Sequence, residues 1–390
     1  SELRPGMIVG ADNAAQYVKY LPAAARFAIA HGLRMRITPP RRIEWSEGFQ
    51  RATEKYSPQV ELDSEDHIKN YIAGMPYPLI NITDPKAAVK IAYNWHLGPV
   101  MPDDFSLQPW SSNGYKADPQ NAQQITADSN ADYQCEQFDF LRFAHRTDVD
   151  PRPTLGSNPN GVEWKAKCNR WTADATGQGT NEGAGIWIRY VAPTHPDEFY
   201  GFDELTRRIR RIGSMDGYPN EFCRGCHQPY WAYALPKTER YSYRLLGTTA
   251  ILACMASANE PAGIAQSESG YALTEEPFEL RNAYIVEMTE RYPEGPSGLR
   301  TIIYIDSEIY LWLAAEFYNG AEETAVAMPL WRMRPSSEGG NLFDLAGDFY
   351  VPTGNANFFR SLIPARVTFK QLINAGTLSA GDFLPEKMVR

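Results

Sequence analysis

A change in hydrophobic period near residue 134 constrains the fold of this chain more than any other feature. From there onward, runs such as 137–143 and 186–190 alternate between apolar and polar residues. A period of two is typical of strands with one buried face. Turn-forming residues such as Asn319-Gly320 separate the runs, so we predict a meander of long antiparallel strands. Further strands are expected at 134–146, 162–172, 283–288, 300–306, 309–317 and 324–334.

The first hundred residues carry helical signals instead. Apolar residues recur at helical spacing in 11–31, where Pro22 should kink or divide the helix. A second helix is expected over 45–56, with Ser46 as its N-cap. A third helix should open at 83–85, where an aspartate can cap the helix and a proline fits its first turn.

No linker or internal repeat divides the chain, so we expect 1–390 to form a single α+β domain. Within it, 1–100 would be a helical N-terminal segment that packs on the sheet. Residues 101–365 would form a large, curved antiparallel sheet. Residues 366–390 would form a C-terminal helix and tail, in which the stretch Thr368 to Asp382 ends in a short helix.

Cys135 and Cys168 are placed as if for a disulfide. Each lies in a predicted strand, and a turn-rich stretch at 151–161 separates the two strands. If these strands form a hairpin, the two cysteines lie opposite each other, which is close enough for a disulfide. The pair could instead remain as reduced packing residues. A disulfide would indicate an oxidising compartment outside the cytoplasm.

The segment Cys223-Arg224-Gly225-Cys226-His227 has the spacing C-x-x-C-H. This spacing is used for covalent c-type haem attachment, in which both cysteines form thioethers and the histidine is an axial ligand to the iron. A local disulfide or a partial metal site would use the same residues. Zinc is less favoured, because no second ligand pair lies nearby. Cys254, which we expect to be buried, could also pair with Cys223 or Cys226 and so exclude haem.

The composition excludes some classes of function. A formal net charge of −9 argues against nucleic acid as a general partner, because a protein that binds the phosphate backbone needs a positive face. The most apolar helical run, 21–33, is too short to span a membrane. The chain begins Ser1-Glu2-Leu3, which resembles a mature N-terminus, so we infer a cleaved leader. Neither a Gly-rich phosphate loop nor Gly-x-Ser-x-Gly is recognisable, and no catalytic residues are assigned.

A set of short motifs occurs in one order along nearly the whole chain. They are Glu44 to Ser57, Tyr71 to Pro78, Asp84 to Ala88, Tyr93 to His96, Asn158 to Lys165, Arg189-Tyr190, Pro193 to Asp197, Arg207 to Ile212 and Tyr243 to Gly247. In this order they resemble the DUF1329 family, a bacterial domain of unknown function.

The resemblance implies a periplasmic protein similar to the outer-membrane lipoprotein-sorting proteins LolA and LolB. Its fold would be an incomplete β-barrel that curves around a hydrophobic cavity and is closed by helices. Such folds bind acyl chains or other apolar molecules, and the family brings no catalytic residues. The chain departs from the family pattern after the arginine-rich strand, where Gly213 to Gly217 and then the C-x-x-C-H motif replace an acidic and aromatic segment.

Arg207, Arg208, Arg210 and Arg211 form a basic run. They are candidates for contact with an anionic head group or a partner protein. The structural alternative is a solvated strand edge whose charges point outward or pair with carboxylates, and we favour that alternative. His96, beside Trp95 at a predicted helix end, is interpreted as a hydrogen-bonded packing residue.

Three functions remain in competition. The first is a non-enzymatic periplasmic protein that binds a lipid or another hydrophobic molecule and carries it toward the outer membrane. The second is an electron-transfer protein with haem c at Cys223, Cys226 and His227. The third is a structural subunit that contacts a periplasmic or outer-membrane partner. Aromatic residues could fill the core or line a cavity for the first of these; the tryptophans considered are Trp110, Trp164, Trp171, Trp187, Trp231, Trp312 and Trp331.

Overall fold

The structure of the chain is a computed structural model. It describes residues 2–100, 104–107, 110–117, 124–142, 161–173, 181–190, 195, 197–203, 207–213, 238–259, 262–267, 270–291, 299–335, 340–352, 358–363 and 380–388.

The predicted N-terminal helices are present, with one change of type. The 11–31 segment is divided at Pro22 into a 3-10 helix, η1 (Ala14–Tyr20), and an α-helix, α1 (Ala23–Ala30). Helix α2 (Glu47–Tyr56) is capped as predicted, since the Ser46 hydroxyl accepts a hydrogen bond from the Phe49 amide at 3.3 Å. A 3-10 turn, η2 (Ser57–Gln59), follows it directly. Helix α3 (Ala87–His96) begins just after the proline turn.

Strands dominate the rest of the chain. The described strands are β1 (Ile8–Val9), β2 (Arg34–Ile37), β3 (Glu61–Leu62), β4 (Ile68–Lys69), β5 (Asp104–Leu107), β6 (Trp110–Ala117), β7 (Ile125–Cys135), β8 (Phe138–Arg142), β9 (Val162–Ala173), β10 (Asn181–Tyr190), β11 (Glu198–Asp203), β12 (Arg208–Gly213), β13 (Tyr241–Ala253), β14 (Ile264–Ser267), β15 (Gly270–Leu273), β16 (Glu275–Glu290), β17 (Leu299–Asp306), β18 (Trp312–Asn319), β19 (Glu322–Pro335), β20 (Asn341–Pro352) and β21 (Phe358–Ile363). Within the described residues, all of them except β3 and β4 belong to one 19-stranded sheet.

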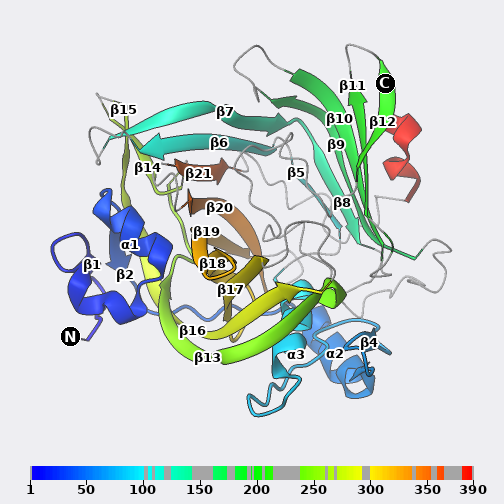
Figure 1. The fold of residues 1–390 in the computed structure, drawn as a ribbon, viewed down its shortest axis with the longest axis horizontal. Coiled ribbons are helices and arrows are strands. Elements are labelled where there is room, and N and C mark those ends of the chain that lie inside the picture. Colours follow the sequence, from blue (N-terminus) through cyan, green and yellow to red (C-terminus); the bar gives the residue numbers. More distant parts are fainter. Residues whose placement is uncertain are drawn as a thin grey trace.

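The sheet runs as one curled, open half-barrel (Figure 1). Its strand pairings lead from β12 through β11 and β10 to β9, whose other side pairs with both β7 and β8. They continue from β7 through β6, β21, β20, β19, β18, β17 and β16 to β13. Every pairing on this path is antiparallel, as predicted. One pairing beside the path differs, since β2 pairs parallel to the start of β16.

Side chains of β19 pack against other residues on both faces of the sheet. Alternate residues of β19 point to opposite sides, as the period of two requires. Ala327 and Trp331 join a core cluster with Phe49 of α2 and Trp95 of α3. Met328 and its neighbours on the other face join a second cluster under α1. The helices therefore lie on two sides of the sheet, with α2 and α3 on the inner side of the curl.

The strands β9, β10 and β11 also have two distinct faces. Their outer face carries apolar residues that pack against Met388, in the 3-10 turn η6 (Pro385–Met388) at the C-terminal end. Figure 1 places this end of the chain outside the curl, beside β10 and β12. Of the stretch Thr368 to Asp382, which was predicted to end in a short helix, only 380–382 are described, and they belong to a second 3-10 turn, η5 (Ala380–Phe383). Among the described residues, no helix has both the length and the apolar character that a membrane span needs.

Two predicted strands are interrupted or begin later than expected. The 134–146 run is interrupted at 136–137, so that β7 ends and β8 begins there. The 309–317 run becomes a strand only at Trp312, because a turn precedes it in which Tyr310 has a positive φ of 55°. A bulky residue rarely adopts this conformation, and the apolar pattern carries no sign of it.

Candidate functional site

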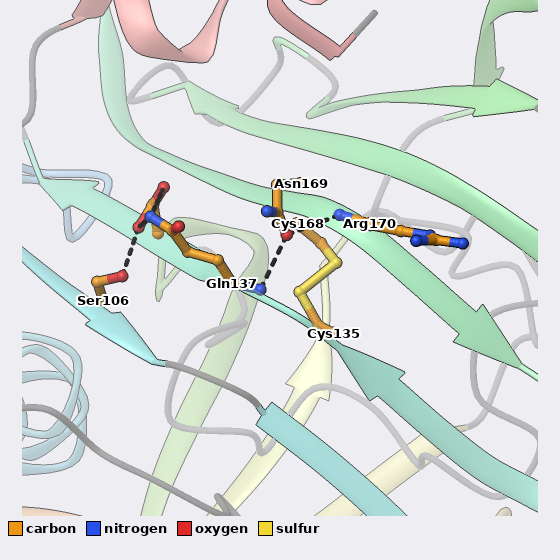
Figure 2. Close-up of a disulfide and its surroundings, with 7 residues drawn as sticks. Ser106, Cys135, Gln137, Cys168, Asn169 and Arg170 are labelled. Carbon is orange, nitrogen blue, oxygen red and sulfur yellow. Dashed lines mark hydrogen bonds between the residues drawn. A yellow bond between two sulfur atoms is a disulfide. The ribbon is translucent and has the colours of Figure 1, made fainter. Parts of the chain in front are cut away.

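Cys135 and Cys168 form the disulfide that the sequence predicts (Figure 2). Their Cα atoms lie 5.9 Å apart, and both residues are fully buried on the inner face of the sheet. The predicted register was wrong, however. Cys135 pairs with Trp171 across the ladder and Cys168 pairs with Phe138. The disulfide therefore crosses the interruption between β7 and β8, where the chain bends out of the regular ladder.

Polar side chains hold this interruption in place. The Asn169 side-chain oxygen accepts hydrogen bonds from the Gln137 amide at 2.8 Å and from the Arg170 amide at 2.7 Å. The side chain of Gln137 donates to Asp139, which also accepts from the Ser106 hydroxyl at 2.6 Å. Figure 2 shows these bonds beside the two sulfur atoms. The disulfide region is thus a fixed part of the framework rather than a reactive site.

The basic run lies at β12, which pairs with β11. Arg207, Arg208, Arg210 and Arg211 are all exposed. Arg207 lies outside β12, in a turn with φ of 52°, and the other three arginines lie in the strand. Arg211 forms an ion pair with Glu198 at 3.4 Å. This arrangement agrees with a solvated strand edge.

Cys223, Cys226 and His227 lie outside the described residues. Cys254 is described, and it is a free, buried cysteine, so it does not pair with either of them. Burial raises the pKa of its thiol, which keeps the sulfur protonated and unreactive. Within the described ranges, no group of three or more His, Cys, Asp or Glu side chains is placed to hold a metal ion.

A continuous row of aromatic rings lies on the inner face of β5, β8, β9, β10 and β11. Phe138 pairs with Cys168 across the ladder. Its ring contacts Trp187 with ring centroids 6.2 Å apart, and Trp187 stacks on Phe199 at 4.8 Å. In the other direction the row continues through Phe105 and Phe140 to Trp164. The members of this aromatic row are Phe105, Phe138, Phe140, Trp164, Trp187 and Phe199.

Two buried arginine side chains lie at one end of the aromatic row. Arg142 and Arg189 each pair with Trp164 in the ladder, from β8 on one side and β10 on the other. Directly paired residues share a face of a sheet, so both guanidinium groups flank the indole on the inner face. The Arg189 Cζ atom lies 5.1 Å from the Trp164 ring centroid. Exposure is 2% for Arg142 and 4% for Arg189.

A β-bulge brings a carboxylate to the same place. Arg189 pairs with Trp164 but Tyr190 pairs with Val162, so Glu163 is an extra residue in β9. Val162 packs in the outer cluster and Trp164 in the inner one. A bulge can re-aim the side chain of its extra residue. Glu163 contacts the imidazole Nε2 of His96, which ends α3 on the inner side.

These groups form what we call the charge cluster: His96, Arg142, Glu163, Arg189 and Asp197. Asp197 is fully buried and accepts a hydrogen bond from Arg189 Nε at 3.0 Å. Arg142 Nη1 donates to the backbone oxygen of His96 at 3.5 Å. Burial alone would raise the pKa of Glu163, but the positive charge of His96, with those of Arg189 and Arg142, lowers it to about 2. Glu163 is therefore ionised at neutral pH despite its burial.

The charge cluster is not fully satisfied from within the described part of the chain. Arg189 Nη1 and His96 Nδ1 are buried atoms without a hydrogen-bond partner there. Leaving a buried donor unpaired costs roughly 1–3 kcal/mol. Two such atoms in one cluster require an explanation, because buried polar groups in folded proteins are almost always hydrogen-bonded.

The charge cluster was not predicted as a site. Glu163, Arg189 and Asp197 were noticed only as parts of separate motifs, and His96 was interpreted as a packing residue. One signal could have found part of it. Phe138, Phe140 and Arg142 alternate on one face, so an arginine occupies a position that the pattern assigns to the core. The bulge at Glu163 and the meeting of α3 with β9 leave no such trace in the sequence.

Comparisons with known proteins give one family and several distant structures. Residues 8–337 match the family described as a protein of unknown function, DUF1329. No curated protein matches the chain. A domain of an outer membrane lipoprotein-sorting protein from Vibrio parahaemolyticus is similar with a TM-score of 0.44 and 11% identity, over 79% of this chain and 100% of that one.

Two further structures are similar at the same level. A DUF1329 family protein from Desulfovibrio piger has a TM-score of 0.44 and 12% identity, over 78% of this chain and 99% of that one. A LolA superfamily protein from Nitrosomonas europaea has a TM-score of 0.39 and 10% identity, over 77% of this chain and 98% of that one.

Proposed function

The chain belongs to the DUF1329 family, and we propose that it is a non-enzymatic protein that binds a hydrophobic molecule against the inner face of its half-barrel. The aromatic row is the observation that carries this proposal. Six rings from five strands lie in contact on the inner side of the curl; five of them are buried, and Trp187 keeps exposed surface. Apolar and aromatic walls of this kind are typical of sites for small hydrophobic ligands.

The border of the inner core supports the same function. Trp187, which lies between Phe138 and Phe199 in the aromatic row, is only partly buried. It is one of a group of apolar side chains that pack against the inner cluster while they keep some exposed surface; the others are Trp45, Ile80, Tyr241, Tyr243, Leu245, Tyr284, Tyr304 and Phe317. A ligand that covered these side chains would remove further apolar area from water, at about 25 cal/mol for each Å².

We place this function in the periplasm, where the ligand would be carried toward the outer membrane. The disulfide between Cys135 and Cys168 supports an oxidising compartment. A periplasmic or outer-membrane protein would then receive or deliver the ligand.

The binding function is tested with a fluorescent apolar probe, 1-N-phenylnaphthylamine, and the purified protein. We expect saturable binding that Trp187→Ala weakens about tenfold, because the variant loses a large apolar contact. Phe202→Ala is the matched control, since Phe202 is a partly buried aromatic residue on the outer face of β11. Absence of saturable binding by the wild type, or equal losses in both variants, would overturn the proposal.

A second candidate function rests on the C-x-x-C-H motif alone. We propose it as an alternative in which Cys223 and Cys226 attach haem c and His227 is an axial ligand to the iron. Protein exported from a host that matures c-type cytochromes should then keep a Soret absorption band after acid–acetone extraction. A colourless protein from that host would eliminate this candidate.

A further inference from the structure

We propose that the charge cluster binds the anionic head group of the hydrophobic molecule, through Arg189 Nη1 and His96 Nδ1, while the tail lies along the aromatic row. This inference rests on the proposed binding function and names the class of ligand: an amphiphile with carboxylate or phosphate oxygens. None of the residues involved was assigned to a site from the sequence.

The first step of the argument concerns the two unsatisfied atoms. Arg189 donates from Nε to Asp197 at 3.0 Å, and this leaves Nη1 directed elsewhere. His96 contacts Glu163 through Nε2, and this leaves Nδ1. Each carboxylate therefore orients a positive group while one of that group's nitrogens remains available. Anionic oxygens form the strongest hydrogen bonds with such donors.

The second step concerns position. Arg189 and Arg142 flank Trp164, the last ring of the aromatic row. The head group of a ligand whose apolar tail lies along the aromatic row would thus lie directly beside the two guanidinium groups. Arg142 adds positive charge beside His96. Apolar walls with a few convergent polar groups are the usual design of a site that orients its ligand.

The third step weighs a purely structural role. The contact between His96 and Glu163 fastens the end of α3 to β9. However, a buried ion pair contributes little net stability compared with apolar packing. A contact that only held α3 against β9 would also need neither two arginines nor buried nitrogens without hydrogen-bond partners. A head-group site accounts for all of these features together.

The test compares three twelve-carbon ligands: dodecanoate, dodecyl phosphate and dodecanol. They compete with the fluorescent probe for the wild-type protein. We expect at least one of the two anions to bind ten times or more tightly than the neutral alcohol, and the tighter anion identifies the head group. The double variant Arg189→Gln/Asp197→Asn removes both charges of one pair, and it should reduce the ratio of the affinity for the tighter anion to the affinity for dodecanol about tenfold.

The matched control is Arg170→Gln/Glu136→Gln, which removes an exposed ion pair from the same region. It should keep the preference for anions. Equal affinity of the wild type for all three ligands would overturn the head-group site but leave the binding function intact. Binding of none of them would overturn both. The wild-type comparison needs no variant, so it decides the question even if the double variant does not fold.

Discussion

Glu163 keeps its negative charge in a buried position because of its neighbours. Its side chain is 13% exposed, yet His96 and the two arginines lower its pKa to about 2 from an ordinary value of 4.5. A carboxyl group with a lowered pKa stabilises the folded state above its unfolded pKa. That contribution is lost as the pH falls through the folded value. The relevant window is therefore between about pH 4.5 and pH 2.

We predict that Glu163→Gln flattens the acid dependence of stability. The wild-type free energy of unfolding should fall by up to about 3 kcal/mol more than that of the variant across this window. Urea unfolding at a series of pH values measures the difference. Glu136→Gln, at an exposed carboxylate, should follow the wild type. Parallel curves for Glu163→Gln and the wild type would contradict the proposed charge state.

The helices and strands themselves were largely predictable. The period of two identified β8, β9, β10 and the strands from β16 to β19 at least in part, and Ser46 and Pro22 marked helix limits, because these signals are local. The break at 136–137, the bulge at Glu163 and the positive φ of Tyr310 were not predictable. Each depends on which residues pack against the strand in the folded protein, and the pattern of apolar and polar residues along the sequence does not specify these contacts. The charge cluster was missed for the same reason, since α3 meets β9 only in the folded chain.

Gly74 shows how closely two elements approach. It has a φ of 77°, and a Cβ atom there would collide with the backbone of Thr53 in α2. We predict that Gly74→Ala lowers stability by more than about 3 kcal/mol, because it combines conformational strain with a clash against a helix backbone. Gly320→Ala is the control, since φ is similar at 62° and nothing lies within 4 Å of its added Cβ. It should cost about 1 kcal/mol. Equal losses in thermal or urea unfolding would refute the close approach.

Across the molecule as a whole, the disulfide joins β7 to β9 at the point where the half-barrel wall branches into β7 and β8. The pairing was predicted from two strand-like runs, but the branch was not. The order of the remaining strands, such as β21 beside β6, was also not predictable. Which strands pair across a large sequence separation is determined by how the whole sheet folds.

We predict that Cys135→Ser/Cys168→Ser lowers the free energy of unfolding by up to about 4 kcal/mol, since the disulfide closes a loop of 33 residues. Urea unfolding with and without dithiothreitol measures this effect. Reductant should bring the wild type to the midpoint of the double variant and leave the variant unchanged. A variant that still responds to reductant would place the stabilising disulfide elsewhere in the chain.

The bulge at Glu163 has an evolutionary consequence. Val162 and Trp164 already point to opposite faces, so deletion of the single residue between them would restore a regular ladder and leave every neighbouring side chain on its present side. The alternation of side chains along β9 therefore does not depend on this carboxylate. Gain or loss of this one residue, by one in-frame codon, would therefore change the charge beside the proposed head-group site without rebuilding the wall.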